Sequence, residues 1–511
     1  MTGRESTMAP TNANRLKARR LGVDTQFEAV VFMHKDCPVC RSEGFSAHTR
    51  IVLSAGNRQI IATLYHVTSD LLAHDEAALS ESAWIRLGLQ DGDTIIASHP
   101  DPIESLSHVR SRIYGNQLDQ AAMNAIIGDV VDGRYSDIHL SALLTAGAAR
   151  PLHDNEVLAL TRAMVEAGDR LSWNSQMVLD KHSVGGLPGN RTSPVVVSII
   201  ASLGLVMPKT SSRAITSPAG TADTMETMAP VDLDTKAIHR VVEQEGGCVV
   251  WGGAVKLSPA DDILIRVERA LDLDCEGQMI ASVLSKKIAA GSTHLVLDLP
   301  VGPTAKVRSE KTATTLSGAL IATAEHFGLK AKVIMGDGTQ PIGRGIGPAL
   351  EAQDVLGVLQ CSPDAPRDLR QRAITLAGAL IELAGLTPSG LGEAKAAQVL
   401  DDGRAWAKFQ RICEAQGGMR VPPSSQYRRE IISRRTGRVE VIDNRRIAKL
   451  AKLAGAPDDK AAGVELHVKL GEQVIAGQPL CTVHAEAPGE LTYALDYAAK
   501  NESMFDVQGR R

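Results

Sequence analysis

The sequence predicts a multidomain protein of the α/β and α+β classes, and three observations lead to this. Its 511 residues are too many for one hydrophobic core, so we expect two to four domains. Short β-like segments come first, and from about residue 174 apolar strand-like runs alternate with helical patterns, an order typical of a mainly parallel sheet. A glycine- and proline-rich stretch at 417–425 then predicts a linker before a last α+β module at 426–511.

Composition excludes several classes of protein. Hydrophobic residues make up 44% and charged residues 22% of the chain, as in soluble globular proteins. The net charge of -4, spread over both signs, gives no reason to expect nucleic acid or a membrane as a partner. Seven scattered cysteines favour a reducing cytoplasm over a disulfide framework. Residues 1–25 lack the apolar segment of a secretory signal, so we expect a disordered tail and a cytoplasmic protein.

Residues 26–103 predict a small β-rich domain. Apolar runs bounded by turn residues lie at 29–33, 50–53, 59–65 and 94–97. Four residues within this region have spacings that suit zinc, namely His34, Cys37, Cys40 and His48. A reduced cysteine pair with a structural or redox-sensitive role is the alternative interpretation.

A small helical lobe is predicted for 104–173, with about 258–290 added to it. Helical periodicity begins near Ser105 and predicts three short helices, the first with one apolar face formed by Leu118, Ala122, Ala125 and Ile126. Ser136 is placed to cap a further helix and Asp154 another.

The large α/β domain, at 174–257 and 291–416, is organised by a glycine-rich turn. The apolar run Met177–Leu179 predicts a strand, and Asp180–Arg191 predicts the turn that follows it. Thr192 or Ser193 can then cap a helix that Gly204 ends. Such a turn presents unpaired N–H groups and the positive end of the helix dipole, which together bind anions. An ordinary loop whose glycines only make the bend is the alternative.

A second turn of similar chemistry follows the next predicted strand, 205–207. Residues 208–221 contain six Ser or Thr side chains, a Lys and an Arg, which complement phosphate and sugar oxygens. Both turns are expected at the same sheet edge, where open α/β sheets bind ligands. The two turns therefore predict that phosphate or a phosphorylated sugar is a reactant, and both phosphoryl and glycosyl transfer remain open.

The rest of the domain continues the alternation. Further strands are predicted at 249–251, 295–298 and 331–335, and helical segments at 258–262, 282–288 and 312–327. The segment Gly343–Pro348 is glycine-rich like a phosphate loop, but it has no Walker lysine, which favours a structural helix entry. In the last module, strands are expected at 438–442 and within 464–474.

These motifs resemble the thymidine phosphorylase and pyrimidine nucleoside phosphorylase family. The resemblance runs roughly from Ser105 to the C-terminus and is carried by Asp180-Lys181-His182-Ser183, Gly185-Gly186, Thr192-Ser193, Pro208-Lys209, Ser211, Arg213, Gly220-Thr221, Ser258-Pro259-Ala260-Asp261, Ser282 and Lys286-Lys287. The chain is similar to the branch that includes archaeal AMP phosphorylase in its extra N-terminal domain and in the segments 189–192, 212–217 and 301–306.

The resemblance implies a fold and an activity. It implies a helical lobe and an α/β lobe with the active-site cleft between them, in a homodimer or larger homo-oligomer. The implied reaction is reversible phosphorolysis, in which inorganic phosphate attacks C1′ of thymidine or a related nucleoside and gives free base and (deoxy)ribose 1-phosphate without a cofactor. Nucleoside 5′-monophosphates are the alternative substrates, giving ribose 1,5-bisphosphate, and an anthranilate-type phosphoribosyltransferase or a nucleotide sensor are further alternatives.

The resemblance also implies roles for individual residues. The implied phosphate ligands are Lys181, Ser183, Ser193, Ser211 and Thr221. The implied nucleoside or nucleotide contacts are Gly186, Ser212, Arg213, Ala214, Ile215, Thr216, Ser217, Arg269, Ser282, Lys286 and Lys306, with Arg266 as an alternative to Arg269. Asp274 matches a proton donor to the base, and His182 could share that role. Pro188 and the run 214–217 depart from the thymidine phosphorylase pattern, which leaves the substrate open.

Overall fold

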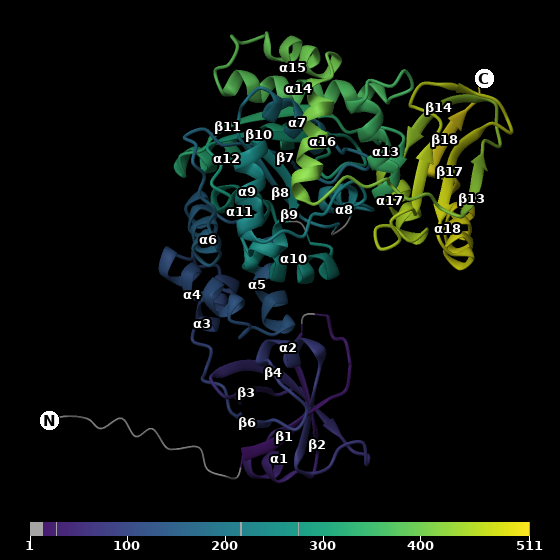
Figure 1. The fold of residues 1–511 in the computed structure, drawn as a ribbon. Coiled ribbons are helices and arrows are strands. Elements are labelled where there is room, and N and C mark those ends of the chain that lie inside the picture. Colours follow the sequence, from purple (N-terminus) through teal and green to yellow (C-terminus); the bar gives the residue numbers. More distant parts are fainter. Residues whose placement is uncertain (1–13, 27, 215–216, 274, 510–511) are drawn as a thin grey trace. The chain divides into compact units, whose positions relative to one another are not determined.

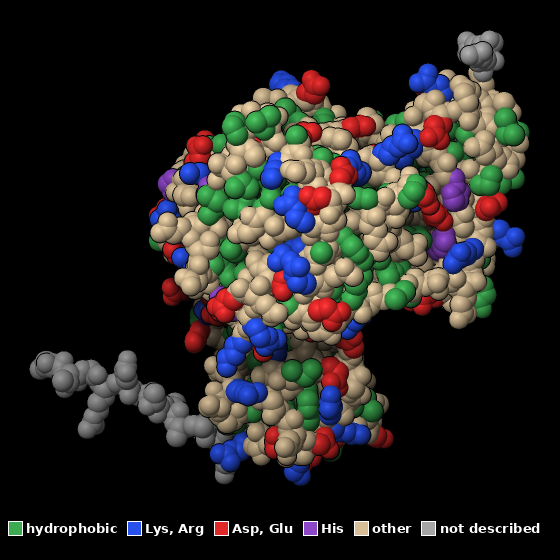
Figure 2. Space-filling view, turned by 45° about the horizontal axis from the view of Figure 1, so that its top comes forward, with side chains coloured by type: hydrophobic (Ala, Val, Ile, Leu, Met, Phe, Trp, Pro, Cys, Tyr) green, Lys and Arg blue, Asp and Glu red, His purple; other side chains and the backbone are tan. Residues whose placement is uncertain are grey.

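The computed structural model describes residues 14–26, 28–214, 217–273 and 275–509, which form two compact units (Figure 1). The first unit comprises residues 1–110 and 129–139, and the second comprises 111–128 and 140–511. On the face seen in Figure 2, Lys and Arg side chains are interspersed with Asp and Glu, as the mixed composition predicts. None of the described helices has both the length and the apolar character needed to span a membrane.

The first unit contains a closed β-barrel. Its strands pair in the order β1-β5-β2-β4-β3-β6, and β1 closes the barrel by pairing in parallel with β5 and antiparallel with β6. Closure leaves no exposed strand edge. The strands are β1 Arg15–Arg20, β2 Val30–His34, β3 Arg50–Ala55, β4 Arg58–Val67, β5 Glu76–Leu79 and β6 Thr94–Ser98, and the helices α1 Pro38–Glu43 and α2 Glu81–Leu87 accompany them.

The first strand lies where the sequence predicts a disordered tail. Strand β1 is rich in charge, yet Leu16 and Ala18 are buried while Lys17 between them is exposed. A strand with only alternate residues buried has no apolar run to detect. The tail prediction is therefore wrong for 15–20, and residues 1–13 lie outside the described part of the chain.

The zinc candidates do not come together as a metal site. Cys37 and Cys40 are buried, and the Cys37 Sγ accepts the Cys40 N–H at 3.1 Å. His34 Nδ1 accepts the Asp36 N–H, and the His48 ring packs edge-on against a tyrosine. Among the described residues, no three His, Cys, Asp or Glu side chains are grouped as ligands for a metal ion. Both cysteines are free in this structure.

Four helices lie between 104 and 173, where the sequence predicts three. They are α3 Leu106–Ile113, α4 Gln120–Val131, α5 Asp137–Ala149 and α6 Asp154–Glu166. Within the second unit α6 packs against α11 (Glu276–Ala289), and α10 (Pro259–Leu271) also contacts α6. The N-cap of α6 is His153 instead of Asp154, because the Glu156 carboxylate accepts the His153 N–H at 3.0 Å.

A parallel sheet forms the centre of the α/β domain. Strands β7 (Leu179–Ser183), β10 (His294–Val301) and β11 (Lys330–Asp337) pair in parallel in the order β11-β10-β7. A parallel bridge between Val178 and Val206 leads on to β8 (Met207–Ser211) and β9 (Gly247–Trp251), which are also parallel. The predicted mainly parallel sheet is confirmed.

Helices pack around this sheet, as Figure 1 shows. They are α7 Ser193–Ser202, α8 Thr221–Glu226, α9 Thr235–Glu245, α12 Glu310–His326, α13 Pro348–Leu359, α14 Arg367–Leu383, α15 Gly392–Asp401 and α16 Arg404–Gln416. Helix α7 is buried from Ser193 to Ala201, and its apolar side chains join one core with α13, α14 and α16. This core supports the glycine-rich turn that precedes α7.

Two strands extend into segments that the sequence predicts as turns. The prediction that the turns begin at Asp180 and Pro208 is wrong, because Asp180–Ser183 and Pro208–Ser211 lie in β7 and β8. The Asp180 carboxylate is fully buried between Lys287, 2.8 Å away, and Lys209, 3.4 Å away. Asp180 is thus buried in ion pairs with a lysine of α11 and a lysine of β8, where a buried strand residue usually has apolar contacts.

The C-terminal module is α+β, as predicted. One antiparallel sheet has the order β12-β15-β17-β13 and the other β16-β14-β18. The elements are β12 Gly345–Ile346, β13 Tyr427–Ile432, β14 Gly437–Ile442, α17 Asn444–Leu453, β15 Gly463–Leu466, β16 Gln473–Val474, β17 Pro479–Ala485, α18 Pro488–Lys500 and β18 Phe505–Gln508. Strand β12 belongs to the glycine-rich segment before α13, and Asp354 Oδ2 accepts the N–H groups of Arg344 and Gly345. These contacts support the structural interpretation of that segment.

Phe409 in α16 provides a test of the core. Its side chain is completely buried, so Phe409→Ala should leave a cavity that costs about 3–5 kcal/mol. We expect the thermal midpoint to fall by roughly 5–15 °C in calorimetry. Val421→Ala, at a residue 90% exposed, is the control and should leave the midpoint unchanged. Equal midpoints for both variants would contradict this core.

Candidate active site

Lys181 lies in the middle of β7, and its ammonium is buried under the first turn. Its Nζ donates to Ser183 Oγ at 2.8 Å and to Thr192 Oγ1 at 2.7 Å. An ammonium has three N–H donors, and the third has no partner among the described residues. Burial lowers the pKa of Lys181 to about 8, against the opposing charge of Asp298. The group is thus a charged donor that is only partly satisfied.

Asp298 within β10 holds the first turn in place. Its carboxylate accepts from Ser183 Oγ at 2.6 Å, from Asn190 Nδ2 at 2.8 Å and from Arg372 Nη2 at 2.5 Å. Burial acts to raise the pKa of Asp298, but the charges of Lys181 and Arg372 keep it below its ordinary value. The Oδ1 atom of Asn190 is buried without a hydrogen-bond partner among the described residues. An acceptor therefore remains beside the Lys181 donor.

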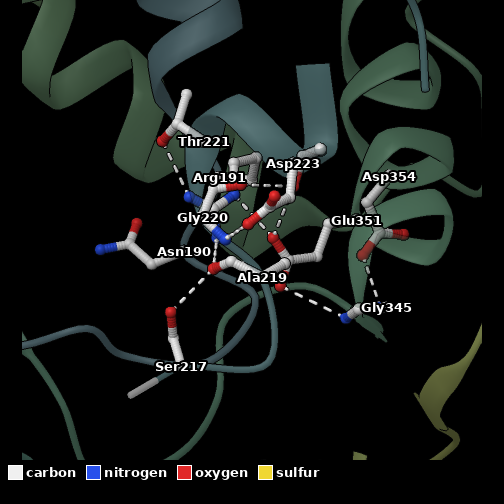
Figure 3. A network of polar contacts seen from close by, with 12 residues as sticks. Asn190, Arg191, Ser217, Ala219, Gly220, Thr221, Asp223, Gly345, Glu351 and Asp354 are labelled. Atoms are coloured by element: carbon white, nitrogen blue, oxygen red, sulfur yellow. Dashed lines mark hydrogen bonds and ion pairs between the residues drawn. The ribbon is translucent and has the colours of Figure 1, made fainter. Parts of the chain in front are cut away.

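Arg191 joins the first turn to the second (Figure 3). Its guanidinium donates to Thr221 Oγ1 at 2.8 Å, to the Ala219 carbonyl at 2.8 Å and to Glu351 Oε2 at 2.6 Å. Glu351 comes from α13 and is buried, and it also accepts from Thr224 Oγ1 at 3.2 Å. The start of α8, with Thr221 as its first residue, is thereby fixed beside the first turn.

The second turn is closed by carboxylates from α8. Asp223 Oδ2 accepts the N–H groups of Ala214 at 2.6 Å and of Gly220 at 2.9 Å, and Figure 3 shows Asp223 pointing toward Gly220. Arg213 donates to both oxygens of Glu226 at 2.8 Å each. The Arg213 guanidinium, implied above as a nucleotide contact, is thus already bound to carboxylates.

A separate group of cations lies near His182. Lys286 Nζ in α11 is 2.5 Å from the buried Asp261 carboxylate in α10, and Asp261 Oδ1 has no hydrogen-bond partner among the described residues. Ser282 is one turn before Lys286 on the same helix. These residues of α10 and α11 supply a cation, which the buried carboxylate holds in place, and a hydroxyl one turn before it.

His182 is neutral at neutral pH. Burial holds its pKa well below the ordinary value, and nearby positive charges add to this effect, in the order Lys287, Lys209, Lys286 and Lys181. A neutral imidazole keeps one N–H donor and one acceptor. The ring is therefore equipped to donate a hydrogen bond to a ligand atom, and is a weak source of a full proton.

The remaining implied residues are placed as follows. Ser193 starts α7 and Ser211 ends β8 at the same sheet edge as Ser183, and Ser212 follows on the surface. Gly186 is exposed with φ of 60°, and a Cβ on Gly185 would lie 3.0 Å from the Lys306 Cβ, so Lys306 borders the first turn.

The other residues that the resemblance implies as ligand contacts or as a proton donor are as follows. Ser217 Oγ donates to the Ala219 carbonyl at 2.8 Å. Arg269 is exposed at the end of α10, where its charge adds to the burial that lowers the pKa of Lys452 in α17. The alternative, Arg266, is half-buried in α10. Ile215, Thr216 and Asp274 lie outside the described residues, so their roles stay predictions.

Several residues that organise the site have no individual role that the sequence predicts. They are Asp180, Asn190, Arg191, Asp261, Asp298, Glu351 and Arg372. One signal was available for Asp298, which is the one charged residue in the otherwise apolar predicted strand 295–298. Glu351 and Arg372 lie in helices, and nothing in their local sequence indicates which charge they pair with.

The sequence of the chain matches three known domain families. Residues 106–168 match the helical bundle domain of the glycosyl transferase family, and residues 175–406 match its a/b domain. Residues 438–504 match the C-terminal domain of pyrimidine nucleoside phosphorylases. The matched ranges include the helices α3–α6, the parallel sheet with both turns, and most of the C-terminal module.

Relatives similar over nearly their whole length carry names that assign them provisionally as thymidine phosphorylases. One from Sphingopyxis alaskensis is 62% identical over 98% of this chain and 97% of its own length. One from a Chelativorans species is 58% identical over 99% of this chain and 100% of its own length. One from Legionella pneumophila is 56% identical over 96% of this chain and 95% of its own length.

A solved structure shares the fold of the central part. The crystal structure of anthranilate phosphoribosyltransferase from Thermus thermophilus superposes with a TM-score of 0.50 and 23% sequence identity. The superposition covers 60% of this chain and 98% of that one.

Variants of the Arg191–Glu351 ion pair can distinguish an effect on stability from an effect on anion binding. Arg191→Met leaves the Glu351 carboxylate buried and unpaired, which should cost about 3–5 kcal/mol and lower the thermal midpoint. The double variant R191M/E351M removes both charges, so we expect it to recover most of the midpoint. It should still bind inorganic phosphate about tenfold more weakly in titration calorimetry, because Thr221 loses its guanidinium partner. If the double variant recovered both the thermal midpoint and the phosphate affinity, the role of Arg191 in phosphate binding would be contradicted.

Proposed function

We propose that this chain, which belongs to the thymidine phosphorylase family of glycosyl transferases, catalyses the reversible phosphorolysis of a pyrimidine nucleoside. The enzyme is a pentosyltransferase. In the proposed reaction an oxygen of inorganic phosphate forms a bond to C1′, the bond from C1′ to the base nitrogen breaks, and the base leaves with the bonding electron pair. Phosphate is a co-substrate, and the reaction needs no cofactor.

The observation that carries this proposal is the partly satisfied donor set between the two turns. Lys181 keeps one N–H for a ligand, and Thr221 is held beside the first turn by Arg191. Ser183, Ser193 and Ser211 bring hydroxyls to the same sheet edge, and the unpaired Asn190 Oδ1 suits a hydroxyl hydrogen. A phosphate placed there is a nucleophile held in position, and positioning removes a large part of the barrier.

The residues near His182 are suited to stabilise the base as it leaves. Negative charge grows on the base as its bond to C1′ breaks, in a transition state that resembles an oxocarbenium ion. Lys286 is a fixed cation, and a neutral His182 donates a hydrogen bond without competing for the proton. Donors fixed where charge develops stabilise the transition state because they need no reorganisation. We assign Asp274 the delivery of a proton to the base.

Nucleoside 5′-monophosphates are the competing substrates. One observation favours them: Lys306 is exposed and borders the first turn at Gly185, so a second cation lies at the rim of the phosphate site. A 5′-phosphate carries about 1.5–2 negative charges, which such a lysine would attract. The two substrate classes share the same phosphorolysis and differ only in this contact.

A substrate panel tests the proposed function. The protein is incubated with thymidine, uridine, CMP or AMP, with and without inorganic phosphate, and free base is measured by chromatography. We expect phosphate-dependent release of base from thymidine or uridine. Release of base from CMP or AMP alone would show that nucleoside 5′-monophosphates, and not nucleosides, are the substrates. Lack of release from all four would contradict phosphorolysis.

The pKa of Lys181 predicts how the use of phosphate depends on pH. Its ammonium is charged below about pH 8 and loses its charge as the pH rises through that value. In the free enzyme kcat/KM for phosphate should therefore fall by up to about tenfold per pH unit above this point. At saturating phosphate, kcat should keep its value to higher pH, because the bound anion raises the pKa of the lysine. A profile for kcat/KM that is flat to pH 10 would show that Lys181 does not bind phosphate.

A further inference from the structure

Two cysteines at the start of helix α1 have no part in the proposed phosphorolysis. Cys37 is the N-cap of α1 and Cys40 is the third residue of that helix, shortly after strand β2 ends at His34. We propose that Cys37 and Cys40 form a redox-active dithiol, which a small disulfide oxidises reversibly to a Cys37–Cys40 disulfide. The pair belongs to the β-barrel of the first unit, so its chemistry can be tested whether or not the chain cleaves a nucleoside.

Backbone hydrogen bonds fix the two cysteines beside each other. The Cys37 N–H donates to the His34 carbonyl at 2.9 Å, and the Cys37 carbonyl accepts the Arg41 N–H at 3.1 Å. The Cys40 N–H donates to Cys37 Sγ at 3.1 Å, so this sulfur lies over the first turn of the helix. Side chains three residues apart on a helix are about 5–6 Å apart at Cβ, close to the span that a disulfide bridges. The bond can therefore close with a small adjustment at the start of α1.

The thiol of Cys37 differs from other buried thiols of the chain. Burial raises the pKa of Cys248, Cys413 and Cys481 to about 12 each. Cys37 is just as buried, yet a hydrogen bond from the Cys40 side chain, with help from backbone N–H groups, lowers its pKa to about 7 against the effect of burial. At neutral pH a large fraction of Cys37 is therefore thiolate, which is the form that attacks a disulfide.

The same contact gives Cys40 the complementary role. Its thiol gives the hydrogen bond to Cys37, and this bond together with burial raises the pKa of Cys40 well above the ordinary value. Cys40 thus keeps its proton while Cys37 is a thiolate. Once Cys37 is part of a mixed disulfide it no longer holds that proton in place, so Cys40 can ionise and attack the Cys37 sulfur.

The proposed exchange balances in atoms and electrons. The Cys37 thiolate attacks one sulfur of the small disulfide, forms a sulfur–sulfur bond to it and expels the other half as a thiolate. Cys40 then loses its proton, attacks Cys37 Sγ and expels the second half. The two cysteines are oxidised by two electrons and the small disulfide is reduced to two thiols. Two protons pass from the cysteines to the released thiolates.

Access to the pair depends on a short helix. Cys37 is completely buried and Cys40 is 3% exposed, so a small disulfide reaches them only when α1 opens. The helix has six residues, of which Val39 and Cys40 are buried, and its ion pair between Arg41 and Asp36 lies on the surface. Such an element opens locally at a small fraction of the global free energy of unfolding. Opening therefore limits the rate of the exchange, while the two thiols set its equilibrium.

The test equilibrates the full-length protein at neutral pH with oxidised and reduced glutathione in several ratios. Acid stops the exchange, free thiols are alkylated, and peptide mass spectrometry locates each modified cysteine. With excess oxidised glutathione most chains should lose two hydrogen atoms and carry a Cys37–Cys40 disulfide, which excess reduced glutathione converts back to two thiols. The control is the exposed Cys361, whose sulfur lies 3.3 Å from the Leu400 carbonyl oxygen and which should carry only a mixed disulfide.

Two serine variants distinguish the roles of the two sulfurs. In Cys40→Ser a hydroxyl can still donate to Cys37, but no second thiol can displace glutathione, so a mixed disulfide should accumulate on Cys37. In Cys37→Ser the remaining thiol is buried without a neighbour that stabilises its thiolate. Its mixed disulfide should form at least about tenfold more slowly.

Four results would overturn the inference. In the wild type they are two free thiols at every glutathione ratio, a mixed disulfide that persists on Cys37, and oxidation that appears only when circular dichroism shows unfolding. The fourth is an equal rate of adduct formation in the two serine variants. Three of these results come from the wild type, so they decide the matter even if a variant does not fold.

Discussion

The structure of the α/β domain depends on pairing charges that are buried in its strands and in helix α13. Asp180, Asp298 and Glu351 are each at most 1% exposed, and each is compensated by cations from a different segment of the chain. Removal of one partner from such a pair costs far more than the pair contributes. These pairs therefore tie the strand ends and the helices α11, α13 and α14 into one arrangement, and both ligand-binding turns are attached to it.

This constraint also gives the site its chemistry. Burial, together with the surrounding cations, lowers the pKa of His182 and keeps its ring neutral, and the carboxylate of Asp298 holds Ser183 and Asn190 while Lys181 keeps a free N–H. Charged donors that are fixed in a buried site interact more strongly with a ligand than they would in water. The same ion pairs thus explain the fold at the strand ends and the proposed binding of phosphate there.

Much of this was predictable from the sequence. The alternation of apolar runs and helical patterns gave the parallel sheet, and glycine with Ser or Thr gave both turns at one edge. Local patterns failed where a distant partner decides the outcome. Asp180 looks like a turn residue until Lys287, more than a hundred residues later, is placed beside it. Strand β1 was missed because barrel closure buries only its alternate residues.

The most direct test of this account is a crystal structure of the protein with inorganic phosphate. The account predicts one phosphate between the two turns, within hydrogen-bond distance of Lys181 Nζ and Thr221 Oγ1, with the contacts of Asp298 and Arg191 retained. A phosphate bound elsewhere, with Lys181 still bonded only to Ser183 and Thr192, would contradict the claim that the two turns form one site.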